Sequence, residues 1–145
     1  MKLKTKYYEH VQAKVAAKNK EKAFASVSAS TFMEVFDSFA SSEEVDVQVL
    51  DVRDADEVAL SKLPDVNVHG AKIPQIFVPL CDVLADPPRV VRMLDTSKRI
   101  FTLCYIGGRS GEACEVLAHA GVKTTNIEGG IENLHRLRPK LIPYY

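Results

Sequence analysis

Several features common in proteins are scarce in this chain, and each absence excludes a class of protein. The 145 residues include no tryptophan and only three cysteines, which form no C-x-x-C pair. An odd number of thiols without such a pair argues against both a disulfide framework and a thiolate zinc site. No apolar run approaches the roughly 20 residues that cross a bilayer, and no secretory signal pattern follows the first lysines. We therefore expect a cytoplasmic protein without a membrane partner.

Charge is balanced over the whole chain, but the basic and acidic residues are unevenly distributed along the sequence. The 19 basic and 19 acidic residues cancel, so the chain lacks the basic excess that nucleic-acid binding requires. Residues 1–22 nevertheless carry seven lysines against two glutamates, at spacings that predict an amphipathic helix. We expect a lysine-rich helical extension over residues 1–23 and a single domain over residues 24–145. A mitochondrial targeting segment is the alternative, but transit peptides are rich in arginine and this segment contains none.

Beyond residue 24 the sequence alternates between short apolar runs and amphipathic stretches. Thr31 and Glu34 have the spacing of a capping box at the start of a helix, and Gly121 stands where a left-handed residue would end another. Strands are expected over residues 45–52, 99–105 and 122–127, and a closing helix is expected over residues 130–138. Residues 76–94 are expected to form a short strand and helical segments that are broken at Pro87 and Pro88. This order predicts an α/β sandwich with a mainly parallel sheet.

The stretch LCYIGGRSG, residues 103–111, combines a thiol, two glycines and an arginine after a buried strand. Such a loop lies at the carboxyl end of the sheet, where open α/β sheets bind ligands. With Gly107 and Gly108 free to take positive φ, the backbone amides can surround an anion, and a helix starting near Arg109 or Ser110 adds partial positive charge. These groups favour a thiolate, so Cys104 is the candidate nucleophile. Arg109 is the candidate fork for an oxyanion.

The other cysteines and the histidines carry no comparable signal. Neither Cys81 nor Cys114 has glycines and a cation beside it, and both are interpreted as small buried hydrophobic residues. The four histidines show no ligand spacing, so no metal site is expected.

Four segments together resemble the rhodanese family. Residues 104–110 look like its active-site loop C-x-x-G-x-R-S, VLDVRDADE like its aliphatic-D-V-R strand, HGAKIP like its G-A-x-x-I-P segment and NIEGGIENL like its L-x-G-G-x-x-x-W segment. Leu134 stands at the family's tryptophan position. The matches run in the family's order over residues 24 to 139 and leave the lysine-rich extension uncovered. The resemblance implies a three-layer α/β sandwich.

The resemblance also implies a sulfurtransferase that works through a Cys104 persulfide. A sulfane sulfur would pass from thiosulfate or a persulfide donor to cyanide or a thiol acceptor, either of them a small molecule or a protein, without a cofactor. The loop residues Tyr105, Ile106, Gly107, Gly108, Arg109 and Ser110 would bind the substrate. Asp51 and Arg53 would orient this loop from the mouth of the sheet, and a structural ion pair between them is the alternative.

The loop also distinguishes this chain from related classes of enzyme. Related phosphatases and arsenate reductases carry five residues between cysteine and arginine, whereas here there are four. Mercaptopyruvate-type enzymes usually have a threonine where Arg109 stands, which favours a thiosulfate-type enzyme. However, Tyr105 and Ile106 form an apolar rim where thiosulfate users often have a basic residue, so we expect a persulfide to be the better donor. A binding or persulfide-relay module without turnover is the remaining alternative. The sequence leaves the oligomeric state open.

Overall fold

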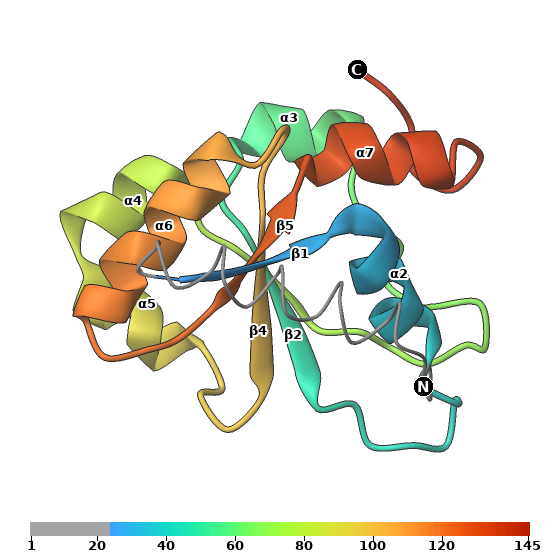
Figure 1. Ribbon diagram of the computed structural model, residues 1–145, viewed down its shortest axis with the longest axis horizontal. Coiled ribbons are helices and arrows are strands. Elements are labelled where there is room, and N and C mark those ends of the chain that lie inside the picture. Colours follow the sequence, from blue (N-terminus) through green and yellow to red (C-terminus); the bar gives the residue numbers. More distant parts are fainter. Residues whose placement is uncertain (1–23) are drawn as a thin grey trace, which may run out of the picture.

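Five parallel strands form the centre of the protein (Figure 1). The computed structural model describes residues 24–145, so the extension predicted over residues 1–23 lies outside the described residues. The strands follow the order β1-β5-β4-β2-β3, and every neighbouring pair is parallel. Their bounds are β1 Ala25–Ser28, β2 Val47–Asp51, β3 Gln75–Phe77, β4 Arg99–Leu103 and β5 Thr125–Glu128. The sequence prediction of a mainly parallel α/β sheet is therefore confirmed.

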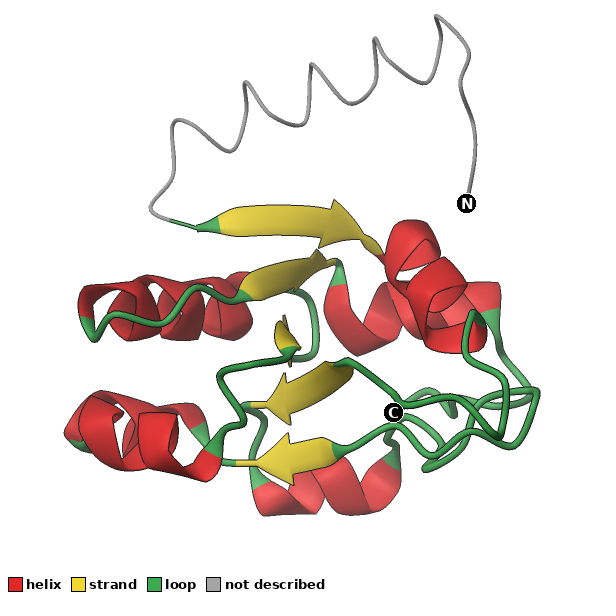
Figure 2. Cartoon of the chain, turned by 90° about the horizontal axis from the view of Figure 1, so that it is seen from below, coloured by secondary structure: helices red, strands yellow, loops and turns green. Residues whose placement is uncertain are grey.

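Helices cover both faces of the sheet and give the three layers (Figure 2). The bounds are α2 Ala29–Asp37, α3 Ala55–Leu60, α4 Leu80–Ala85, α5 Pro87–Met93, α6 Gly108–His119 and α7 Gly130–Leu137. One apolar core joins α2 and α7 to the sheet around Phe32 and Ile131. The other joins α4, α5 and α6 to it around Val83 and Leu117. Because the sheet is covered twice, β2 is buried at all five positions, including Gln48 and Asp51.

The starts of α2 and α5 differ from the sequence expectation. Helix α2 begins at Ala29 with Ser28 as its N-cap, whose Oγ accepts a hydrogen bond from the Thr31 N–H at 3.1 Å. The expected capping box at Thr31 was therefore wrong, because Ser28 caps the helix three residues earlier. The proline pair does not simply interrupt a helix: Pro87 begins α5, where the missing N–H costs nothing. Gly121 has the expected left-handed conformation after α6, with φ +91°.

The parallel arrangement brings the carboxyl ends of β2, β4 and β5 to one edge of the sheet. Three helices begin there, because α3 follows β2, α6 follows β4 and α7 follows β5. Figure 1 shows α3, the start of α7 and the C-terminal segment gathered at this edge. Residues from distant parts of the sequence therefore meet around the loop after β4.

None of the helices within residues 24–145 has the length and apolar character needed to span a bilayer.

Candidate active site

The turn between β4 and α6 holds the Cys104 sulfur beside a backbone N–H and a hydroxyl. Cys104 follows the last residue of β4 and is 1% exposed. Its Sγ accepts a hydrogen bond from the Gly107 N–H at 3.0 Å and lies 3.3 Å from the Ser110 hydroxyl oxygen. Gly107 can turn its N–H inward because it has φ +106°, a conformation that favours glycine. Gly108 does not share this conformation: it is the first residue of α6, which begins slightly earlier than expected.

Asn126 on β5 anchors this turn. The Ser110 hydroxyl lies 2.5 Å from Asn126 Oδ1, and Asn126 Nδ2 donates to the Gly107 carbonyl at 3.3 Å. One side chain therefore holds both residues that contact the Cys104 sulfur. Sequence reasoning gave Asn126 no role. The signal that could have found it was an amide inside the strand expected over residues 122–127, because a polar group buried in a sheet requires partners.

Helix α7 fixes the backbone on the other side of the cysteine. The N–H groups of Ile131 and Glu132 donate to the carbonyls of Cys104 and Tyr105, each at 3.0 Å. These contacts need Gly130, because a Cβ at this position would overlap the Cys104 carbonyl oxygen and lie 2.5 Å from that of Tyr105. The backbone at Cys104 and Tyr105 is thus hydrogen-bonded to the beginning of α7.

Arg109 is engaged by a carboxylate that sequence reasoning did not single out. Its Nη1 and Nη2 donate to Glu57 Oε1 and Oε2 at 2.6 and 2.8 Å, a bidentate ion pair between α6 and α3. Hydrogen bonds from Arg109 lower the pKa of the Glu57 carboxyl to about 2, against the opposing effect of burial. The same pair raises the pKa of the Arg109 guanidinium. Glu57 belongs to the acidic turn after the D-V-R strand, and only the fold brings it to Arg109.

Asp51 and Arg53 lie next to this ion pair and form a second one. Both side chains are fully buried, and Arg53 Nη2 lies 2.8 Å from Asp51 Oδ2. Burial acts to lower the pKa of the Arg53 guanidinium, but the hydrogen bonds to Asp51 and Tyr145 raise it. Arg53 Nη1 donates to the Tyr145 hydroxyl at 3.1 Å, and this hydroxyl donates to Glu57 Oε2 at 3.0 Å. Asp51 and Arg53 therefore connect to Arg109 through Tyr145 and Glu57.

The rim of the loop is apolar and aromatic. Ile106 is 60% exposed at its tip. The Tyr105 ring packs against that of Tyr145, with 5.0 Å between the centroids. A hydrogen bond with the Tyr144 hydroxyl at 3.1 Å raises the pKa of Tyr105 to about 12, so the phenol is neutral at physiological pH. The Tyr105 and Ile106 side chains at the rim are therefore uncharged.

The other two thiols have different environments. Cys114 is buried in α6, and burial raises the pKa of its thiol, so it stays protonated at neutral pH. Cys81 is exposed, which makes the expectation of a buried hydrophobic residue wrong there, because α4 turns this position to solvent. Within residues 24–145, no three His, Cys, Asp or Glu side chains are grouped as metal ligands.

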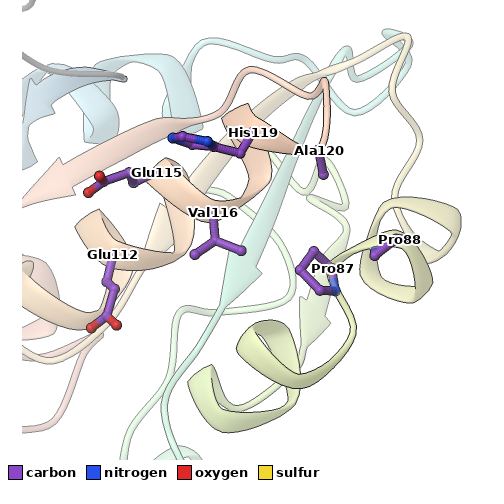
Figure 3. Close-up of a pocket in the computed structure, with 7 residues that line it drawn as sticks. All are labelled: Pro87, Pro88, Glu112, Glu115, Val116, His119 and Ala120. Carbon is purple, nitrogen blue, oxygen red and sulfur yellow. The ribbon is translucent and has the colours of Figure 1, made fainter.

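A hollow of about 570 Å³ lies on another part of the surface (Figure 3). It is found between the prolines that begin α5 and one face of α6, which presents Glu112, Glu115 and His119. None of the residues from Cys104 to Ser110 lines it. The hollow is therefore separate from the cysteine loop.

Comparison with known proteins identifies relatives over most of the domain. The rhodanese-like domain family matches residues 39–137. The chain is 31% identical over 101 residues to rhodanese-like/PpiC domain-containing protein 12, chloroplastic, of Arabidopsis thaliana, a match that covers 69% of this chain and 31% of that protein. It is 31% identical over 86 residues to putative sulfurtransferase YtwF of Bacillus subtilis (strain 168), covering 59% and 71% of the two chains. The chain thus spans about a third of the length of the Arabidopsis relative.

The fold has a match among solved structures. A crystal structure of a protein from Staphylococcus saprophyticus subsp. saprophyticus superimposes with a TM-score of 0.59 at 20% identity. This superposition covers 82% of the present chain and 98% of the other. At this identity the likeness supports the fold alone.

Proposed function

Because the chain belongs to the rhodanese-like domain family, we propose that it is a sulfurtransferase that carries a sulfane sulfur as a persulfide on Cys104. The observation that carries this proposal is the Gly107 N–H that donates to the Cys104 sulfur, beside the Ser110 hydroxyl. Both lie at the start of the 12-residue helix α6, whose N-terminus adds partial positive charge. This is the environment that a thiolate and a persulfide anion require.

The reaction consists of two displacements at sulfur. In the first, the Cys104 thiolate attacks the outer sulfur of a donor persulfide, a new S–S bond forms, and the donor thiolate leaves with the electron pair of the broken S–S bond. In the second, a cyanide or thiolate acceptor attacks the outer sulfur of the Cys104 persulfide, and the Cys104 thiolate is regenerated. Atoms and electrons balance without an external oxidant or reductant, so the two steps call for no cofactor. Covalent storage between them gives ping-pong kinetics.

The surroundings of the loop favour a persulfide over thiosulfate as the donor. The exposed Ile106 offers apolar contact to a bulkier donor or to a protein persulfide. The guanidinium of Arg109 is held by Glu57, which reduces its attraction for a small dianion. The three unpaired cysteines agree with a reducing compartment such as the cytoplasm.

Intact-protein mass spectrometry tests this function. The protein is incubated with glutathione persulfide or with thiosulfate, and its intact mass is measured. The mass is measured again after cyanide is added. The Cys81→Ser background removes the exposed thiol, and Cys104→Ser is compared with Cys114→Ser in that background. We expect a gain of one sulfur atom that cyanide removes, present in the Cys114 variant, absent in the Cys104 variant, and larger with the persulfide. If no donor loads Cys104, the sulfurtransferase proposal is wrong and a binding module takes its place.

A further inference from the structure

We infer that Glu57 is a positioning residue that selects the sulfur donor by its charge, because it neutralises Arg109 at the loop. This inference rests on the proposed function and adds a residue outside the cysteine loop. It predicts that the charge preference of the enzyme is set from α3, through an ion pair, although the loop itself contains an arginine.

The first support is the way in which Glu57 is held. Both of its carboxylate oxygens accept from Arg109, at 2.6 and 2.8 Å. Oε1 also accepts from the Asp54 N–H at 3.1 Å, and Oε2 accepts from the Tyr145 hydroxyl at 3.0 Å. The Glu57 side chain is 20% exposed and that of Arg109 is 35% exposed. A carboxylate fixed by four donors keeps the guanidinium in one orientation, whereas a lone surface pair would open easily.

The second support is the charge that remains at this edge of the sheet. Arg109 is paired with Glu57 and Arg53 is paired with Asp51, so each cation has its own carboxylate. An approaching anion therefore meets backbone N–H groups at the N-terminal end of α6. Neither arginine adds a net charge there, because each is paired with a carboxylate. Tyr105 and Ile106 at the rim add no charge. Removing the Glu57 carboxylate would expose one full positive charge to the donor.

The size of the effect depends on the donor. One added unit charge at contact distance near a solvated surface changes binding by about tenfold for each charge on the ligand. Thiosulfate carries two negative charges and the methanethiosulfonate anion carries one, and both deliver a sulfane sulfur to a thiolate. Loading from thiosulfate releases sulfite, and loading from methanethiosulfonate releases methanesulfinate. The ratio of their kcat/KM values should therefore rise about tenfold in favour of thiosulfate when the Glu57 charge is removed.

The experiment measures this ratio in wild type, Glu57→Gln, Glu57→Asp and the double variant Glu57→Gln/Arg109→Gln, with cyanide as the acceptor. We expect the tenfold rise in Glu57→Gln only, because aspartate keeps the charge and the double variant removes the freed cation. Glu115→Gln is the matched control for net charge, because it removes a carboxylate of α6 that is not paired with Arg109. It should leave the ratio unchanged.

The outcomes distinguish this inference from the proposed function. Both donors are measured on the same preparation, so the ratio does not depend on the fraction of protein that is folded. A ratio that stays constant in Glu57→Gln, or that rises equally in Glu115→Gln or in the double variant, overturns the role of Glu57 while the sulfurtransferase function stands. If the wild-type protein accepts sulfur from neither donor nor from a persulfide, the proposed function itself fails.

Discussion

Replacing Gly130 with alanine tests whether the start of α7 holds the cysteine loop in place. Gly130 has φ +54°, and a Cβ there would overlap the carbonyl oxygen of Cys104. The backbone atoms in its way cannot rotate aside as a flexible side chain would. To relieve the overlap, α7 has to move away from the loop and give up the hydrogen bonds from Ile131 and Glu132 to the carbonyls of Cys104 and Tyr105.

The expected cost has two parts. Left-handed backbone costs a residue with a Cβ about 1–2 kcal/mol. The two hydrogen bonds add about 0.5–1.5 kcal/mol each, because their donors and acceptors lie at the loop between packed elements. Gly130→Ala should therefore lower the free energy of unfolding by about 2–5 kcal/mol. It should also slow sulfur loading of Cys104, because the carbonyl contacts position the turn that carries the sulfur.

Two other glycines are matched controls for this variant. Gly121 has φ +91°, and a Cβ added there would meet no atom within 4 Å beyond its chain neighbours, so Gly121→Ala should cost only the backbone part, about 1–2 kcal/mol. Gly108 is helical and equally open, so Gly108→Ala should stabilise by about 0.4–1 kcal/mol. Urea unfolding gives all three values, and donor kinetics give the loading rate. A Gly130→Ala protein no less stable than Gly121→Ala, with an unchanged loading rate, would refute the argument.

Two further predictions concern the polar contacts around the loop. Asn126→Ala removes the side chain that holds Ser110 and Gly107. It should lower the free energy of unfolding by about 1–2 kcal/mol and kcat/KM for the sulfur donor by about tenfold. Urea unfolding and donor kinetics that match wild type would contradict this. Glu57 has a pKa of about 2 in the folded protein, below its ordinary 4.5, so its contribution is present above about pH 4.5 and is lost as the pH falls toward 2. After allowance for solvent screening this contribution is about 1–2 kcal/mol, and urea unfolding at pH 6 and pH 3 should show it in wild type and not in Glu57→Gln. An equal loss of stability in both proteins would speak against the ion pair as its source.

Much of the fold could be predicted because it depends on local patterns. The segments at β2 and β4 indicate strands, the apolar run at β4 indicates cover on both faces, and the left-handed Gly121 marks the end of a helix. The start of α2 was misplaced because Ser28 and Thr31 are both good N-caps, and the choice between them depends on where β1 ends. Cys81 was misjudged for a similar reason, since its exposure follows from how α4 packs on the sheet.

The sequence by itself determined the chemistry available to this protein: a cysteine, a turn of glycines and an arginine joined in one short loop after a buried strand. These residues are neighbours in the chain, so their spacing already limits how they can meet. Tertiary structure decided what surrounds them. Glu57 reaches Arg109, and Asn126 reaches Ser110, only because parallel strands bring their carboxyl ends to the same edge of the sheet. Electrostatic and hydrogen-bond energies depend on distances of a few ångströms across the fold, and no spacing along the chain encodes those distances.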